Sequence, residues 1–346
     1  EARDLSRVKR LLSNYIFIRV VRAILTVFIV ATLTFFIVRL MPGNPIEIYI
    51  GQLMSQYGMT FQDAKNQAAA LFSLDLDAPL FEQYIIYMKN LLRGDLGMSF
   101  LSQGTPVSLL IASYLPWTIF SVGISILISF TLGILLGMIS AYKRGGIFDH
   151  IISTIAAILS AIPNYLIGIL LLIIIGVQLG LIPVSSMRGT VSPGITPGFN
   201  WTFIKDIFSH ALLPILTYVV STVGGWTLSM KSSTLNTISE DYVTVAKARG
   251  LPESRITLSY VGRNAILPLF TSLTMQMGFL MGGSTLIESI FVYKGIGWAL
   301  GSSIAQRDYP VMQAVFLIIT IAVVVANFIA DLLYSRLDPR IKVGGE

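Results

Sequence analysis

The chain has 346 residues, of which 54% are hydrophobic and only 12% are charged, and its mean hydropathy is +0.75. About a quarter of the residues are charged in an ordinary soluble domain, so this composition excludes a soluble fold and indicates a protein that resides in lipid. There is no cysteine, which excludes disulfides and thiolate metal ligands. The net charge of +6 is better explained by membrane topology than by nucleic-acid binding, because the basic residues divide unevenly among the predicted loops.

Six long apolar stretches predict six membrane spans, each about 20 residues or longer. In chain order, the predicted segments are a basic cytoplasmic segment 1–22, a span 23–40, an external helical cap 41–116, spans 117–141 and 151–181, an external loop 182–210, a span 211–230, a cytoplasmic loop 231–263, a span 264–287, an external loop 288–310, a span 311–334 and a cytoplasmic tail 335–346. The predicted fold class is therefore all-α, a polytopic bundle of six transmembrane helices with both termini cytoplasmic.

The external insertion, 41–116, contains helical signals of its own. In its first half, apolar residues share one helical face: Phe61, Ala64, Ala68, Leu71 and Phe72. In its second half, Pro79 opens a helix and Gly94 closes it, because proline suits the start of a helix and glycine suits its end. Such a cap either receives a partner or covers the outer surface, and the sequence leaves both interpretations open.

The third span, 151–181, is longer than the hydrocarbon core, because at about 1.5 Å per residue it would measure roughly 46 Å. Pro163 lies inside it, so the stretch is either one kinked helix or two segments that meet at 162–164. Two segments would place the basic loop 231–263 outside, whereas one kinked helix places two thirds of the 24 Lys and Arg residues in the cytoplasm. We therefore expect one kinked helix.

The central parts of the six spans contain no Asp, Glu, Lys, Arg or His. Carriers driven by protons or voltage normally need such a group in the membrane, although a sodium-coupled carrier could use backbone carbonyls instead. No lysine follows a glycine, which excludes the phosphate-binding loop of ATPases. If ATP drives this protein, another subunit binds it.

Neutral polar residues do occur in the predicted spans, at Asn164, Thr274, Gln276 and Asn327. Such residues form hydrogen bonds between helices or line a hydrated path for a polar solute. The sequence leaves both interpretations open, and these four residues are the candidate lining of a translocation pathway.

The longest cytoplasmic loop, 231–263, carries a predicted helix with residues at helical spacing on one face: Tyr242, Val245, Ala246 and Arg249. Ser239 suits the N-cap position of this helix. A short cytoplasmic helix with an apolar face is expected to dock into a groove of a partner. A helix that lies on the membrane surface without a partner is the alternative.

The two ends of this helix also follow the expected pattern. The acidic Glu240 and Asp241 lie in the first turn and the basic Lys247 and Arg249 lie in the last, which complements the helix dipole. Gly250 and Pro252 then stop the helix.

This loop carries a two-part motif, in residues 241–251 and 263–268, that resembles the loop motif of the inner-membrane permeases of ATP-binding-cassette importers. Ala246 and Gly250 take the places of the motif's second Ala and its Gly, and Val245 replaces the first Ala. That departure is usual in the dipeptide/oligopeptide branch. Further segments resemble this branch in the same order along most of the chain: 41–45, 93–97, 276–283, 307–310 and 331–340.

The resemblance implies the first permease subunit of a multi-pass importer in the cell membrane, with peptides or similar polar solutes as cargo. It implies four partners besides lipid, namely a second permease, two ATPase subunits and an external solute-binding protein. ATP and Mg would be bound by the ATPase subunits, so this chain would hold no cofactor, no metal and no catalytic residue. The residues implied to couple to an ATPase are Glu240, Asp241, Tyr242, Ala246, Lys247, Arg249, Gly250 and Leu251.

Three other interpretations stay open. Oligosaccharides or metal complexes are alternative cargoes within the same family. From a different class, an ion-coupled carrier or a channel would transport its solute without ATPase subunits, and a passive membrane scaffold would transport nothing.

Overall fold

The computed structural model describes residues 15–40, 45–72, 78–102, 104–184, 187–273, 276 and 285–337. Within these ranges the chain is helical, apart from turns, loops and an isolated bridge between Met98 and Pro106. The predicted all-α class is therefore confirmed. The chain divides into two compact units, Glu1–Trp117 with Lys294–Val324, and Thr118–Tyr293 with Val325–Glu346.

Among the described residues, four helices are long and apolar enough to cross a membrane. They are Phe17–Val38 within α2 (Tyr15–Leu40), α6 (Val107–Tyr142), α9 (Trp201–Ile238), and Tyr309–Ile329 within α16 (Tyr309–Leu337). A bent pair, Ile147–Ala161 with Asn164–Gln178, passes the same test as one segment. The predicted span 264–287 includes 274–275 and 277–284, which lie outside the described residues, so the count of six and the orientation stay predictions.

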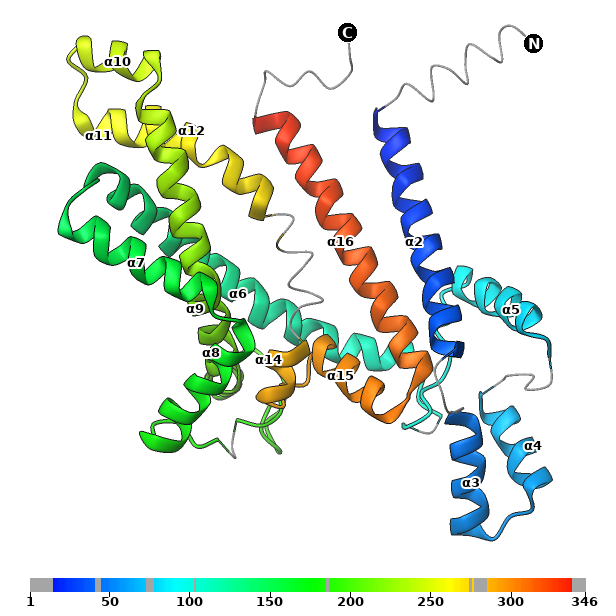
Figure 1. Ribbon diagram of the computed structural model, residues 1–346. Coiled ribbons are helices and arrows are strands. Elements are labelled where there is room, and N and C mark those ends of the chain that lie inside the picture. The colour runs from blue at the N-terminus through cyan, green and yellow to red at the C-terminus, as the bar shows by residue number, and fades with distance from the viewer. Residues whose placement is uncertain are drawn as a thin grey trace, which may run out of the picture. The chain divides into compact units, whose positions relative to one another are not determined.

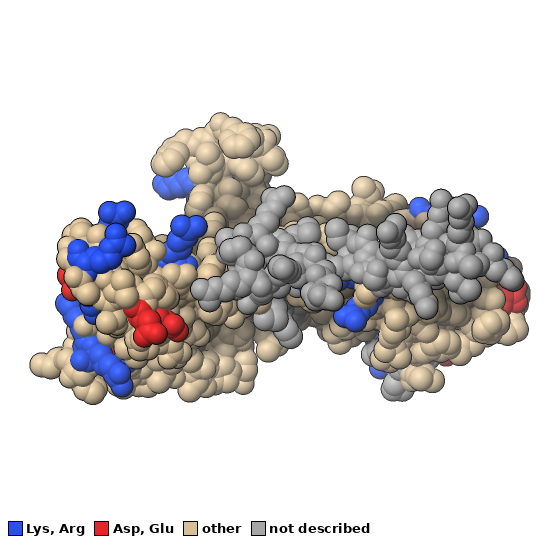
Figure 2. Space-filling model, turned by 90° about the horizontal axis from the view of Figure 1, so that it is seen from above, with Lys and Arg blue, Asp and Glu red and all other residues tan. Residues whose placement is uncertain are grey.

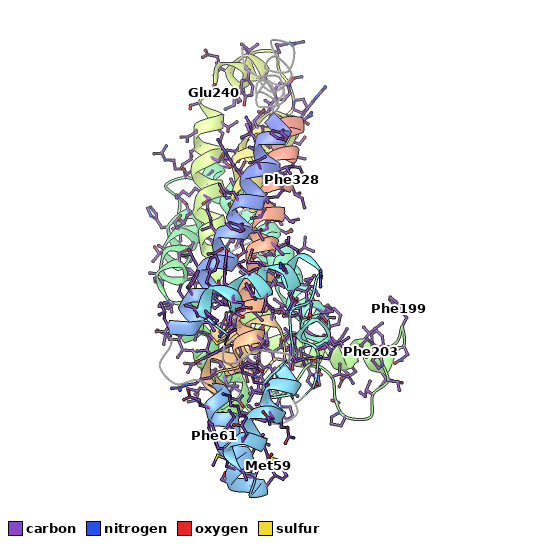
Figure 3. The ribbon with its side chains drawn as sticks, turned by 90° about the vertical axis from the view of Figure 1, so that its right-hand side faces the viewer. Met59, Phe61, Phe199, Phe203, Glu240 and Phe328 are labelled. Carbon is purple, nitrogen blue, oxygen red and sulfur yellow. The ribbon has the colours of Figure 1, made fainter. Side chains whose placement is uncertain are left out.

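In the first unit, α3 (Pro45–Tyr57) and α4 (Phe61–Phe72) form a helical hairpin (Figure 1). Its core is a set of buried residues from both helices: Tyr49, Ile50, Leu53, Ala64 and Ala68. Ala64 and Ala68 lie on the predicted face of α4, and their small side chains allow α3 to approach closely. Phe61, predicted on the same face, is exposed, because it lies at the tip of the hairpin next to Met59 (Figure 3). Helix α3 was not predicted.

Helix α5 (Leu80–Leu92) lies beside α2 (Figure 1). The ring of Tyr84 stacks on that of Phe36 with 5.5 Å between centroids, and the ring of Tyr87 lies 5.3 Å from that of Phe35. Burial raises the pKa of Tyr87 to about 12. The cap is thus joined to a predicted membrane helix through a cluster of aromatic rings.

Helices α15 (Ile296–Gln306) and α16 share a core with the start of α6: Val107, Ile111, Ile296, Ala299, Leu300, Val311, Ala314 and Val315. The buried Asp308 lies between α15 and α16. Its carboxylate accepts hydrogen bonds from Ser99 Oγ at 2.5 Å and from the backbone N–H groups of Phe100 and Leu101 at 3.2 and 3.3 Å. Asp308 therefore fastens the segment that precedes α6 to the start of α16.

In the second unit, α6 packs against α9 through two glycines spaced by four residues. A Cβ at Gly133 would lie 2.3 Å from the Cβ of Trp226, and a Cβ at Gly137 would lie 2.4 Å from the backbone oxygen of Thr227. Small residues at this spacing let the backbones of membrane helices approach closely. The ring of Phe130 meets that of Trp226 edge to face, with 5.0 Å between centroids.

The predicted third span breaks at Pro163, as expected, but it is not one kinked helix. Helix α7 (Ile147–Ala161) ends before the break, and α8 (Asn164–Leu171) and the π-helix η1 (Leu172–Gln178) follow it. The two arms are bent by 102°. Proline lacks a backbone N–H and disfavours helical geometry in the residue before it, and Ile162 is extended with a ψ of 126°. The stretch thus consists of two helical arms rather than one continuous helix, and the expectation that both arms belong to one membrane span stays a prediction.

Candidate functional site

The loop that follows α9 folds into a compact helical group at one end of α9 (Figure 1). The group consists of α10 (Asp241–Ala248), α11 (Glu253–Arg255), the π-helix η2 (Ile256–Gly262) and α12 (Arg263–Ala265). Glu240 lies at the tip of this end (Figure 3) and has an extended backbone, with φ −71° and ψ 144°. This extended residue ends the long helix and turns the chain directly into α10.

One face of α10 is buried within the loop itself. Val243 is 1% exposed and Ala246 is 2% exposed, and both pack against Ile256 and Val261 of η2. Leu251 covers the edge of this small core. Ala246, which was predicted on the docking face, is thus buried inside the loop, and its role in coupling stays a prediction. The apolar partners that bury Ala246 come from the chain after the α10 turn, and the periodicity of α10 alone does not reveal them.

Helix α10 ends in a Schellman motif, as the position of Gly250 predicts. Gly250 has a φ of +69°, a conformation that glycine adopts without the penalty of a Cβ. Its N–H donates to the carbonyl of Lys247 at 2.9 Å, and the N–H of Leu251 donates to the carbonyl of Ala246 at 3.3 Å. These bonds fix the end of α10 and place Leu251 over the loop core.

The predicted start of α10 needs a correction of one residue. Glu240 occupies the N-cap position, whereas Ser239 is the C-cap of α9. The hydroxyl of Ser239 donates to the backbone oxygen of Asn236 at 2.7 Å, so it is directed back to α9. Asp241 lies in the first turn of α10 and Lys247 in its last, as predicted, whereas Arg249 is the C-cap residue just after the last turn.

The outer face of α10 is exposed and combines apolar and charged groups. Val245 is 57% exposed, and Tyr242, one turn earlier, is partly exposed. Asp241, Lys247 and Arg249 are also exposed. Figure 2 shows lysine, arginine and acidic side chains gathered around this end of the molecule. We call the exposed side chains of Tyr242, Val245 and Arg249 the α10 outer face. A rigid helix with an apolar centre and a charged border can dock into a complementary groove.

Below this loop, α9 is joined to α7 by an ion pair that the sequence did not predict. Lys231 Nζ pairs with Asp149 Oδ1 and donates to Ser153 Oγ at 2.8 Å. The other carboxylate oxygen of Asp149 accepts the backbone N–H of Gly145 at 3.1 Å. The sequence did offer one indication of this pair. Lys231 and Asp149 are charged residues of opposite sign, and each lies within two positions of the end of a predicted apolar span.

Another buried carboxylate lies one residue beyond the predicted span 264–287. Glu288 is 0% exposed and accepts a hydrogen bond from Thr118 Oγ1 at 2.8 Å. The central parts of the predicted spans thus contain no charged residue in sequence, but a carboxyl group is buried directly at the end of one of them. A bonded hydroxyl group reduces the cost of that burial.

Three of the four candidate pathway residues lie in the part of the chain that the structure describes. Asn164 is the first residue of α8 and is half-buried, Gln276 is half-buried, and Asn327 on α16 is exposed. Thr274 lies outside the described residues. Among the residues that the structure describes, no hydrogen bond links these side chains, so their role in a pathway stays a prediction.

Comparison with protein families gives two matches that together extend over most of the chain. Residues 133–343 match the family described as binding-protein-dependent transport system inner membrane component. Residues 12–120 match the N-terminal region of binding-protein-dependent transport system membrane components.

Curated relatives match over nearly their full length. The chain is 34% identical over 328 residues to the di/tripeptide transport system permease protein DppB of Pseudomonas aeruginosa (strain UCBPP-PA14), covering 92% of this chain and 95% of that protein. It is 31% identical to the oligopeptide transport system permease protein AppB of Bacillus subtilis (strain 168), covering 96% and 100%. It is 32% identical to the glutathione transport system permease protein GsiC of Escherichia coli O6:H1, covering 95% and 99%.

A solved structure shares the fold. A chain of the MetNI methionine ABC transporter in inward-facing conformations superposes with a TM-score of 0.53 at 17% identity, covering 67% of this chain and 97% of that one. At this identity the likeness concerns the fold alone.

Proposed function

Because the chain belongs to the family of inner-membrane components of binding-protein-dependent transport systems, we propose that its α10 outer face couples it to an ATPase subunit of a peptide importer. The chain is a multi-pass permease subunit in the cell membrane and a transport component rather than a catalyst. The observation that carries the proposal is the exposed Val245 at the centre of the α10 outer face, on a helix whose opposite side is fixed by its own core.

The proposed coupling acts through a rigid connection. Val243 and Ala246 hold α10 against η2, so a force on α10 moves the whole loop. One extended residue, Glu240, separates α10 from α9, and Lys231 pairs α9 with α7. Closure of an ATPase subunit against α10 would therefore tilt α9 and α7 together, which converts a movement between subunits into a movement of membrane helices.

The partners follow from this role. The proposed complex contains this permease, a second permease, two ATPase subunits and an external solute-binding protein. ATP and Mg would bind to the ATPase subunits, since no lysine in this chain follows a glycine as a phosphate-binding loop requires. The α10 outer face presents Arg249 and an exposed tyrosine, residue types that often dominate the energy of protein interfaces.

The proposed cargo is a short peptide. Relatives at 31–34% identity are named for di/tripeptides, oligopeptides and glutathione, which are all short peptides or peptide derivatives. The central parts of the predicted spans offer no charged group that would select a peptide by its side-chain charge. Oligosaccharides and metal complexes are the competing cargoes. Mass spectrometry of what the purified binding protein retains would separate these three classes.

Reconstitution of the assembled complex in vesicles tests the coupling. We expect ATP-dependent uptake of a labelled tripeptide by the unmodified complex, and a loss of at least about tenfold in Val245→Glu, because a buried unpaired charge at an interface costs several kcal/mol. The matched control is Leu258→Glu, which changes another exposed apolar residue of the same loop, on η2.

Two outcomes would contradict the proposal. Normal uptake by Val245→Glu would exclude the α10 outer face as the coupling surface. Uptake by this chain in vesicles without ATPase subunits, driven by an ion gradient, would instead favour a secondary carrier.

A further inference from the structure

An open groove of about 500 Å³ runs along one side of α9. Four polar residues of α9 line it, namely Ser229, Ser232, Ser233 and Asn236, and the facing segment contributes Pro268 and Ser272. None of the described residues that line this groove is charged. The groove lies at the end of α9 that leads into the α10 loop, which is the predicted cytoplasmic end of the fourth span.

Three of these side chains are available for a ligand. Ser233 Oγ donates to the backbone oxygen of Ala265 at 2.6 Å, so it is already used within the protein. Ser229, Ser232 and Asn236 are exposed, and the described part of the chain provides no hydrogen-bond partner for their side chains. A hydroxyl and a carboxamide each both donate and accept, as the N–H and C=O groups of a peptide main chain require.

The spacing of these three residues fits an extended peptide. Residues 229, 232 and 236 lie on one face of α9, and at about 1.5 Å per residue they extend over roughly 10 Å. An extended chain advances about 3.3 Å per residue, so the same length accommodates about three residues. The groove therefore matches the main chain of a tripeptide in length as well as in polarity.

The floor of the groove is rigid. Leu269 lines it and is buried in a cluster with Trp226, Met230 and Ala265, and Phe130 of α6 completes this cluster. Because the floor belongs to a packed core, the groove is formed before any ligand enters. Binding to a preformed site loses no free energy to ordering of that site.

We propose that this groove binds the main chain of the transported peptide as it leaves the pathway toward the cytoplasm. The proposal rests on the proposed import of peptides and assigns the binding contacts to Ser229, Ser232 and Asn236. A helix of the second permease is the competing occupant. The backbone groups of a helix are already bonded to one another, so a helix would leave these three side chains without main-chain partners, whereas an extended peptide satisfies them.

The test introduces charge into the neutral groove of the assembled complex. Uptake of two tripeptides, one with a lysine and one with a glutamate side chain, is measured for Ser232→Lys and Ser232→Asp. We expect Ser232→Lys to lower the ratio of lysine-peptide to glutamate-peptide uptake by at least about threefold, and Ser232→Asp to raise it, because charges a few Å apart interact even through water. Ser259→Lys and Ser259→Asp, at an exposed serine of η2, should leave the ratio unchanged.

An unchanged ratio in both Ser232 variants, with uptake continuing, would overturn the groove while leaving the proposed function intact. Uptake by the unmodified complex tests that function separately. If the charged variants do not assemble, Ser232→Cys decides, because the chain contains no other cysteine. Protection of this cysteine from a thiol reagent by the tripeptide during transport supports the proposal. A crosslink to the second permease that forms equally with and without peptide overturns it.

Discussion

Lys231 of α9 and Asp149 of α7 form an ion pair, and Ser153 bonds to both of them. Lys231 Nζ donates to Ser153 Oγ at 2.8 Å, and Ser153 Oγ donates to Asp149 Oδ1 at 3.0 Å. Asp149 also lies in the first turn of α7, where a negative charge is favoured by the helix dipole. This cluster joins two helices that are separated by about 80 residues in sequence, close to the loop that carries α10.

We expect Lys231→Met to lower the Tm of the purified protein by about 5 °C, because it leaves the Asp149 carboxylate buried without its cation. Thermal unfolding in detergent measures this change. The exchanged pair, Asp149→Lys with Lys231→Asp, should recover part of the loss, although a lysine at the start of α7 opposes the helix dipole. Equal Tm values for the single variant and for the unmodified protein would contradict a stabilising role of the pair.

Two neighbouring glycines of α9 give a second prediction, in which Gly225 serves as the control for Gly224. A Cβ at Gly224 would lie 2.3 Å from the backbone oxygen of Ala156 and 2.6 Å from Ser160 Oγ, whereas a Cβ at Gly225 meets nothing within 4 Å. Gly224→Ala should destabilise the protein by about 1–3 kcal/mol, because α7 must move away from α9. Gly225→Ala should be neutral or stabilise it by up to about 1 kcal/mol through helix propensity. Denaturant unfolding compares the two, and similar effects would refute the close contact of α7 with α9.

The small core under α10 predicts a local effect. Val243→Ala removes two buried methyl groups and should destabilise the loop by about 1–3 kcal/mol, while the exposed Thr244→Ala should have little effect. Hydrogen exchange of the backbone N–H groups of α10 measures the stability of this unit. Unchanged protection in Val243→Ala would show that α10 is held by something other than this core.

The expected loss of stability in Gly250 variants depends on the backbone conformation alone. Nothing lies within 4 Å of a Cβ built there, but φ is +69°, so Gly250→Ala should cost about 1–2 kcal/mol through backbone strain without a steric clash. Gly250→Asn should cost less, because asparagine tolerates this conformation better than alanine. Thermal unfolding and ATP-dependent uptake both measure the effect. A larger loss in the asparagine variant than in the alanine variant would argue against the Schellman motif as the cause.

The features that the sequence predicted correctly depend on local chemistry. Pro79 and Gly94 border α5, Pro163 marks the break between α7 and α8, and Gly250 ends α10. Each depends on the backbone preferences of one residue and its immediate neighbours, which the sequence displays directly. The family resemblance was also predicted from short motifs, and the comparisons confirm it.

The features that the sequence did not reveal depend on partners distant in the chain. Val243 and Ala246 are buried by residues of η2, Lys231 is paired with a residue of α7, and Glu288 is bonded by Thr118 of α6. Periodicity shows that a helix has an apolar face, but it does not show which element covers that face. The sequence did not reveal the groove residues Ser229, Ser232 and Asn236 either, because a serine or asparagine near the end of a span looks like any other loop residue until its neighbours are known.

Helix α9 has 38 residues, so at about 1.5 Å per residue it is roughly 57 Å long, nearly twice the thickness of a hydrocarbon core of about 30 Å. In a helix of this length, a small rotation produces a large displacement of the far end. Rotation of α9 by only about 10° around one end would carry the opposite end through about 10 Å, a distance comparable to the diameter of a helix. The contact with the ATPase therefore does not need sub-ångström precision, because a small rotation of α9 at that end displaces its other end by about the diameter of a helix.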